Sequence, residues 1–158
     1  MLVQNLIDLI NAETNDLLDD TDNIPYINNA IDVLSFLLDS ISSPEMITTI
    51  NVKNGDDIPS NFMDFVPHNG YPLSVQNSKF TILTNDTEIY NVRYYAPKPH
   101  ISLVSDTLPF NDMYVSILCF IAAYTIKKKM YIPPDYCQED KAFIEEVMGL
   151  IKSAKGGS

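Results

Sequence analysis

Four segments of the chain carry apolar residues at the spacing of a helix. Near the amino terminus, Leu2, Val3, Leu6, Ile7 and Ile10 recur every three or four residues and predict a helix over residues 2–13. The same spacing predicts helices over residues 24–41 and 135–153. A further helix, third in chain order, is predicted over residues 110–129. Between Met113 and Ile126 only Ser116 and Thr125 are polar, so we expect this third helix to be surrounded by other elements.

The third helix needs a defined start, and the sequence offers one before residue 110. Asp106 or Thr107 is predicted to cap it, because short polar side chains accept hydrogen bonds from the first helical N–H groups. Pro109 would then sit near the first helical position, where its missing N–H costs nothing.

Residues 46–96 carry the pattern of extended strands instead. Met46–Val52 is rich in Ile and Thr, and Glu88–Tyr95 is rich in β-branched and aromatic residues. Leu73–Gln76 and Lys79–Leu83 flank Asn77-Ser78, a pair suited to a two-residue hairpin turn. The sequence therefore predicts a mainly α protein with a β-hairpin or small antiparallel sheet inserted between its second and third helices, of class α+β. We expect a single domain over residues 1–155, followed by a flexible tail over residues 156–158.

The charge of the chain is concentrated in its first part. Residues 1–64 hold twelve acidic residues and one basic residue, Lys53, whereas residues 65–158 hold nine of each, so the whole net charge of −11 lies in the first 64 residues. Such a surface repels phosphates and excludes tight binding of nucleic acid. Two interpretations stay open, namely simple solubility and a surface past which DNA moves without sticking.

Residue types that would support catalysis or metal binding lack the necessary spacing. Neither His68 nor His100 has a second His or a Cys at ligand spacing, and both are predicted to lie in loops. The acidic stretch 16–23 lacks the Gly and distal Glu of a calcium loop, and Cys119 and Cys137 are predicted to be reduced thiols. We therefore expect no enzyme activity and no metal or cofactor. The start of the chain, with no basic residue and with Asp8, predicts folding in a cytoplasm.

Several short motifs occur in an order that resembles a known family. They are Ile-Pro-x-x-Phe at Ile58–Phe62, Asp-Phe-Val at Asp64–Val66, the stretch Tyr71–Ile82, Val-Arg-Tyr-Tyr-Ala-Pro-Lys-Pro at Val92–Pro99, and Leu-Pro-Phe-Asn-Asp at Leu108–Asp112. Over residues 2–153 the chain resembles the head-to-tail adaptor, or connector, family of tailed bacteriophages, the small neck proteins that sit beneath the portal. One departure is that family members commonly carry acidic residues directly after Leu-Pro, where this chain has Phe110-Asn111.

The resemblance implies a four-helix bundle-like adaptor fold with a β insertion. It also implies a ring, usually of twelve subunits, between portal and tail, around a channel through which DNA passes without specific binding. The expected partners are other copies of the chain, the portal protein, and a tail or second neck protein, with no membrane. The expected location is the neck of a virion assembled in the host cytoplasm. No catalytic, metal or cofactor residue is implied.

Interface residues are predicted from side-chain chemistry, because Tyr has the amphipathic area that interfaces favour. The candidates are Tyr90, Tyr94 and Tyr95, with Tyr114 and Tyr131 as further members, although packing inside the subunit is an equal alternative. Two further hypotheses concern the assembly. The charge split suggests that the acids of residues 8–64 line or flank the channel. The position of the C-terminal helix and tail after the last packed stripe suggests that they, with Lys141, Lys152 and Lys155, insert into the portal. The alternative function is a small acidic regulator or inhibitor that binds one partner protein.

Overall fold

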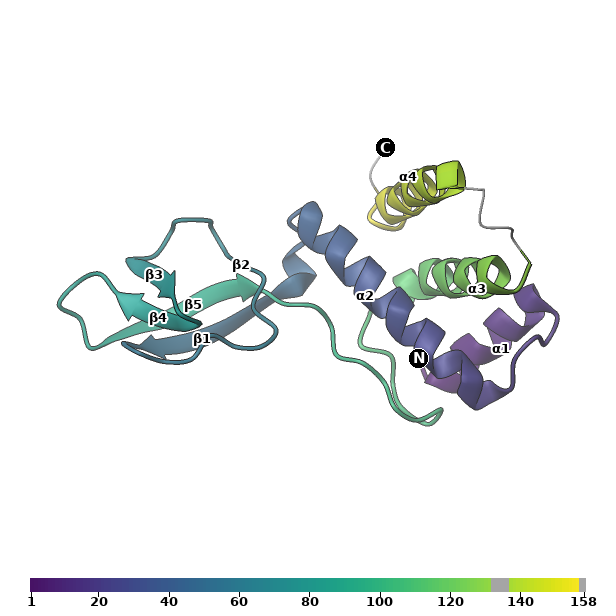
Figure 1. Cartoon of the computed structure of the whole chain (residues 1–158), viewed down its shortest axis with the longest axis horizontal. Helices are drawn as coiled ribbons and strands as arrows, with labels where there is room; N and C mark the ends of the chain where they lie inside the picture. Colours follow the sequence, from purple (N-terminus) through teal and green to yellow (C-terminus); the bar gives the residue numbers. More distant parts are fainter. Residues whose placement is uncertain (132–136, 157–158) are drawn as a thin grey trace. The chain divides into compact units, whose positions relative to one another are not determined.

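The computed structural model describes residues 1–131 and 137–156, and the side chains of all of these except 130, 131 and 137–141. The described part contains four α-helices and two small antiparallel sheets, with the strands between the second and third helices (Figure 1). The predicted α+β class is confirmed. The chain divides into two compact units, a helical unit of Met1–Leu37 with Lys98–Ser158 and a β unit of Leu38–Pro97.

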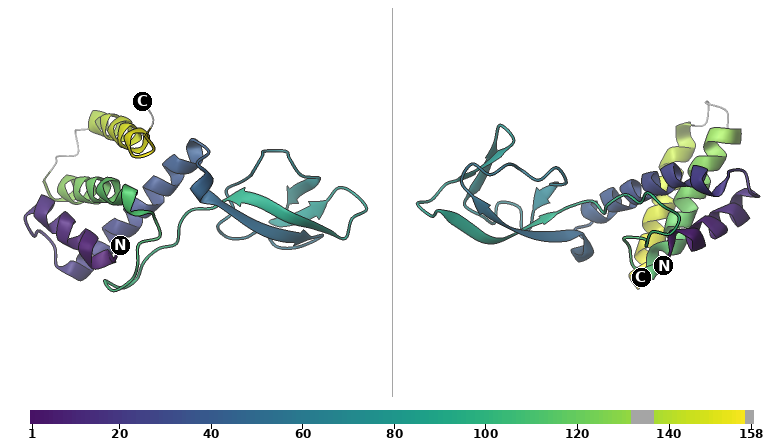
Figure 2. Two further views of the ribbon diagram at one scale, coloured as in Figure 1. Left: turned by 180° about the vertical axis from the view of Figure 1, so that it is seen from behind. Right: turned by 90° about the horizontal axis from the view of Figure 1, so that it is seen from below.

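The helices have bounds close to those predicted. They are α1 (Val3–Thr14), α2 (Ile24–Ser40), α3 (Val115–Tyr131) and α4 (Cys137–Ala154), with a 3₁₀ turn at Asp20–Asn23 before α2. The predicted start of the last helix at residue 135 lies outside the described residues. Within the helical unit, α1 and α3 lie side by side (Figure 2), and Val3, Leu6, Ile7 and Ile10 of α1 are buried. No helix among the described residues has the length and apolar character needed to cross a membrane.

The third helix starts later than predicted, and a different residue caps it. Asn111 accepts a hydrogen bond from the Met113 N–H at 3.0 Å and opens a 3₁₀ turn, Asp112–Tyr114, which leads into α3. The Asp106 carboxylate instead accepts the N–H groups of Ser102 and Leu103, at 2.8 and 2.9 Å, and these bonds lower the pKa of Asp106. The predicted cap was wrong because Asp106 is committed to a turn of the connector that precedes α3.

That connector also completes the start of α1. No side chain caps α1, whose first N–H groups need acceptors. The Val3 N–H is donated to the Asp106 carbonyl at 2.8 Å, and the Gln4 N–H to the Val104 carbonyl at 3.0 Å. Backbone segments about a hundred residues apart in the sequence therefore hold the helical unit together.

The β unit consists of two small sheets. In the first, β1 (Ile47–Lys53), β5 (Glu88–Tyr95) and β2 (Asp64–Phe65) lie in the order β1–β5–β2, all antiparallel. In the second, β3 (Leu73–Gln76) and β4 (Lys79–Ile82) form the predicted hairpin. Asn77 and Ser78 both have positive φ, 52° and 62°, as a two-residue primed turn requires. The turn after β1 joins the two sheets, because its Gly55 N–H is donated to the Phe80 carbonyl of β4 and the Phe80 N–H is donated to the Asp56 carbonyl, both at 2.8 Å.

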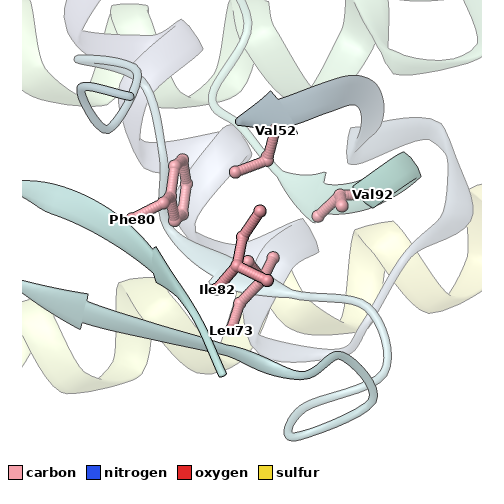
Figure 3. Close-up of a cluster of buried hydrophobic side chains, with 5 residues drawn as sticks. All are labelled: Val52, Leu73, Phe80, Ile82 and Val92. Atoms are coloured by element: carbon pink, nitrogen blue, oxygen red, sulfur yellow. The ribbon is translucent and has the colours of Figure 1, made fainter. Parts of the chain in front are cut away.

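Side chains from both sheets meet in one apolar core (Figure 3). Its buried members are Val52, Leu73, Phe80, Ile82 and Val92. Phe62 packs edge-on against the Phe80 and Phe65 rings, with centroid distances of 5.8 and 5.0 Å. Because every sheet is too small to bury a face by itself, this shared core is what stabilises the β unit.

Replacing the central ring of this core tests how much the core contributes to the stability of the β unit. We expect Phe80→Ala to lower the free energy of unfolding by about 3–5 kcal/mol, the usual cost of deleting a buried aromatic ring. Leu83→Ala, one residue past the same strand and exposed, is the matched control and should change it by less than about 0.5 kcal/mol. Urea denaturation of both variants measures the difference, and equal effects would contradict the assignment of the core.

Candidate interaction surfaces

A bulge in β5 decides which of its side chains face outward. Ile50 pairs with Val92, but Val52 pairs with Ile89, so Tyr90 and Asn91 together oppose the single residue Asn51. Asn91 has a φ of 55°, and its N–H is donated to the Asn51 side chain at 3.0 Å. The extra residue moves Tyr90 to the face opposite Val92, where strict alternation would have buried it.

The outer face of the three-stranded sheet is the set of residues that point away from the core. It comprises Ile47, Thr49, Lys53, Asp64, Glu88, Tyr90, Arg93 and Tyr95, assigned from the strand register. Tyr90 is 65% exposed, and Arg93 is also exposed. The Glu88 carboxylate accepts a hydrogen bond from the Tyr90 hydroxyl, which raises the pKa of Tyr90. This face presents aromatic rings and an arginine, the residues enriched at protein interfaces.

The predicted tyrosine set divides between surface and core. Tyr90 is exposed and Tyr95 is half-buried, whereas Tyr94 and Tyr114 are buried. Tyr94 donates its hydroxyl to the Asn61 side chain at 3.2 Å and packs on the Phe62 ring. For Tyr94 and Tyr114 the alternative of packing inside the subunit therefore holds. The side chain of Tyr131 lies outside the described residues.

The acidic residues of the first part of the chain are largely at the surface. Of the twelve acids in residues 1–64, all except Asp39 and Asp64 are exposed. On the helical unit, neutral amides rather than cations contact several of them: Gln4 donates to both Asp8 and Asp20, and Asn11 donates to Asp20, each at 3.0 Å. The negative charge of this surface is therefore not neutralised by those contacts. Within the described chain, no three acidic, His or Cys side chains gather as metal ligands.

Asp39 is an exception among these acids. One of its carboxylate oxygens is buried and has no hydrogen-bond partner in the structure. Burial, followed by the nearby negative charge of Asp64, raises the pKa of Asp39. Asp39 also lies in the last turn of α2, where the helix dipole disfavours negative charge. The ionised side chain is therefore a local source of instability in the β unit.

A hollow of about 470 Å³ lies between α1 and α3 in the helical unit. Leu9, Glu13, Cys119, Phe120, Tyr124 and Lys127 are among its lining residues. Burial, with a smaller contribution from Glu13, raises the pKa of the Cys119 thiol to about 11, although Lys127 acts in the opposite direction. Cys119 is therefore a neutral thiol at physiological pH and a poor nucleophile. The sequence did not reveal this hollow, because its walls come from helices separated by a hundred residues.

Both histidines are paired with carboxylates on the surface. His68 Nδ1 lies 3.0 Å from Asp64, and His100 Nε2 lies 2.8 Å from Asp32. Each contact engages one ring nitrogen of a histidine whose side chain is exposed at the surface. Each histidine holds a loop against a neighbouring element of its own unit.

The predicted lysine set is described only in part. Lys152 lies in the last turn of α4 and Lys155 follows the helix, and both are exposed. They are three residues apart, so they lie near each other at one end of α4. The side chain of Lys141 lies outside the described residues.

Removing the charge at Asp39 should stabilise the protein in a pH-dependent way. The raised pKa means that ionisation costs more in the folded chain, so stability falls as the pH rises through that pKa. We expect Asp39→Asn to raise the free energy of unfolding by about 0.5 kcal/mol at pH 7, and the gain to disappear at acidic pH, where Asp39 is protonated in both the folded and the unfolded chain. Glu146→Gln, at an exposed position of α4, is the control. A gain that does not change with pH would contradict the assignment.

Thiol reactivity tests the environment of Cys119. In a Cys137→Ser background at pH 8, we expect Cys119 to react with a disulfide reagent more than about 100-fold more slowly than a free cysteine, whose ordinary pKa is about 8.5. The rate should rise roughly tenfold per pH unit, and unfolding in urea should restore ordinary reactivity. Fast labelling of the folded protein at pH 8 would show that the thiol is not shielded.

Three surface features of the described chain thus stand out: the outer face of the sheet, the acidic surface of the helical unit, and the hollow between α1 and α3. Comparison of the chain with known protein families gives no match, and comparison with curated proteins gives no significant match.

Proposed function

We propose that this chain is a virion structural protein, a head-to-tail adaptor that forms a ring between the portal and the tail of a bacteriophage. The ring, usually of twelve copies in the family that the sequence resembles, would surround the channel through which DNA passes. In this proposal the helices form the bundle-like body of the adaptor. The partners are other copies of the chain, the portal, and a tail or second neck protein, and the chain is no enzyme.

The observation that carries the proposal is the order of the elements. Two helices precede the β unit and two follow it, with the strands inserted between α2 and α3. The resemblance implies this order of elements. Two of the motifs on which the resemblance depends lie at element boundaries, since Leu108–Asp112 leads into α3 and the motif that begins at Val92 spans the end of β5. Agreement between motif positions and element ends supports the proposal more than composition does.

The outer face of the sheet gives the proposed ring one of its contact surfaces. A closed ring needs two different surfaces on each subunit, because every copy meets its neighbours head to tail. Tyr90 combines large exposed area with a polar hydroxyl, and Arg93 lies beside it on the same strand. We assign this face to the contact with a neighbouring copy or with the portal.

The exposed acidic residues are consistent with a channel through which DNA moves without being bound. Carboxylates repel the phosphate backbone and do not retain it, and we propose that those of residues 8–64 line or flank the channel. Lys152 and Lys155, at the end of α4, have the opposite sign. With Lys141, they are proposed to enter the portal.

A second candidate function is a small acidic regulator that binds one partner protein. The same exposed acids favour it, since a negative surface attracts a basic partner. The two functions differ in stoichiometry, because an adaptor joins a ring of many copies and an inhibitor binds a single partner. Binding to a portal ring therefore separates them.

Portal binding is tested with portal rings from the phage that encodes the chain. We expect the wild-type protein to add a complete ring, visible in electron micrographs and as a stepwise gain in particle mass. Tyr90→Ala should weaken this binding about tenfold or more, the effect of truncating an aromatic anchor in an interface, while leaving the thermal unfolding temperature nearly unchanged.

Leu83→Ala is the matched control, because Leu83 is equally exposed on the β unit but lies outside the outer face. It should bind like the wild type. A wild-type protein that never associates with the portal ring, or one that binds it as a single copy, would overturn the adaptor function and favour the regulator.

A further inference from the structure

Strand β1 is paired along only one of its edges. The Ala96 N–H is donated to the Met46 carbonyl at 2.9 Å, which sets the phase of the ladder between β1 and β5. Thr48 and Ile50 therefore turn their backbone groups toward β5, and Ile47, Thr49 and Asn51 turn theirs the other way. The carbonyls of Tyr95 and Arg93 accept from Met63 and Val66 on the opposite side of β5, which agrees with this phase.

The outward backbone groups of β1 are almost all unpaired within the described chain. The Ile47 N–H is donated to the Pro44 carbonyl in the preceding turn. The N–H and C=O groups of Thr49 and Asn51, and the C=O of Ile47, have no backbone partner in the part of the chain that the structure describes. Thr49 and Asn51 are exposed. This edge is therefore open to a further strand.

The opposite edge of the same sheet is closed. β2 has only two residues, and the Phe65 N–H is donated to the Asp64 carboxylate at 2.8 Å. The chain beyond β2 offers no longer edge, because the Tyr71 hydroxyl bridges the Val66 carbonyl to the Arg93 N–H of β5, at 2.9 and 3.1 Å, and Pro67, which follows, has no N–H. The contrast matters, because proteins commonly protect edge strands with charge, proline or short length. β1 has none of these between Ile47 and Val52.

We propose that β1 binds β1 of a second copy of this chain, antiparallel, about a two-fold axis at Thr49. In this register Thr49 lies opposite Thr49, and Ile47 opposite Asn51, so both backbone groups of Thr49, the Asn51 N–H and the Ile47 C=O of each strand find a partner. Threonine pairs directly opposite each other are favourable in antiparallel sheets. The result is one continuous sheet in the order β2–β5–β1–β1–β5–β2.

Charge selects this register over its neighbours. An axis at Ile50 would pair Thr49 with Asn51 and leave Lys53 opposite Ile47, whose N–H groups are donated to Asp56 and Pro44. The backbone alone therefore does not separate the two registers. With the axis at Thr49, Lys53 of one copy comes near the turn before β1 that carries Glu45 of the other copy, an acidic residue whose carboxylate accepts from the Ser43 hydroxyl, so opposite charges lie near each other at both ends.

This contact goes beyond the proposed adaptor function and does not depend on it. It is isologous and closes at two copies, whereas a ring needs a head-to-tail contact. A contact made by one strand from each copy is small, below the standard interface size of about 1,200–2,000 Å². We therefore expect a weak, concentration-dependent dimer of the free protein.

A charge exchange at Thr49 tests both the contact and its axis. Sedimentation velocity of the wild type over a range of concentrations should show a monomer–dimer equilibrium. Thr49→Lys and Thr49→Glu should each raise the dissociation constant of the dimer more than about tenfold, because like charges then lie opposite each other on the two-fold axis. An equal mixture of the two variants should regain it. Thr87→Lys, in an exposed turn of the β unit, is the control and should dimerise like the wild type.

A disulfide trap checks the register independently. Residues directly opposite in a hydrogen-bonded pair have Cα atoms about 5.5 Å apart, within reach of a disulfide. Thr49→Cys should therefore give a cross-linked dimer on oxidation, whereas Thr48→Cys, which would oppose Ile50, should not. Circular dichroism confirms that each variant is folded.

Three results would overturn the proposal: a wild type that is monomeric at every concentration, a mixture that stays monomeric, or equal cross-linking of both cysteine variants. None of these bears on portal binding, and loss of portal binding does not bear on them. The adaptor function and the dimer therefore fail or stand separately.

Discussion

The pairing of β1 with β5 is the interaction on which the β unit depends. Residues 54–87 separate the two strands in sequence, and their ladder brings Val52 and Val92 into the core that also holds side chains of the β3–β4 hairpin. The bulge at Tyr90 and Asn91 belongs to the same ladder. It turns Tyr90 out of the core and so creates the aromatic outer face. One local irregularity in backbone pairing thus decides both what the unit buries and what it presents.

The helical unit is closed by backbone hydrogen bonds rather than by a side-chain cap. The connector before α3 supplies the acceptors for the first N–H groups of α1, and the Leu108 N–H is donated to the Met1 carbonyl at 2.9 Å. This arrangement ties the beginning of the chain to a segment that follows the whole β unit. An insertion between α2 and α3 is tolerated because the two flanking parts hold each other directly.

The reactive and charged side chains of the molecule differ in their surroundings. Each histidine contacts a carboxylate, and burial keeps the Cys119 thiol protonated. On the helical unit, neutral amides donate to the carboxylates of Asp8 and Asp20. The aromatic outer face and the open edge both belong to the sheet that contains β1 and β5, whereas these two acids belong to the helical unit.

Local chemistry in the sequence was sufficient for the elements themselves. The hairpin at Asn77-Ser78 follows from residues that tolerate positive φ, the strand Glu88–Tyr95 from its β-branched and aromatic content, and α1 from its three-to-four-residue stripe. Each of these three elements depends on residues within a few positions of one another, so the apolar periodicity and the turn residues are sufficient to predict it. The tertiary structure alone decided that Asn111 rather than Asp106 caps the turn into α3, because Asp106 is bound by Ser102 and Leu103. It also decided that Tyr94 is buried while Tyr90 is exposed, and that β1 keeps an open edge. These outcomes depend on which segments, distant in the sequence, provide the hydrogen-bond partner of each backbone group and the packing surface of each ring. The local pattern of residues along the chain does not specify those contacts.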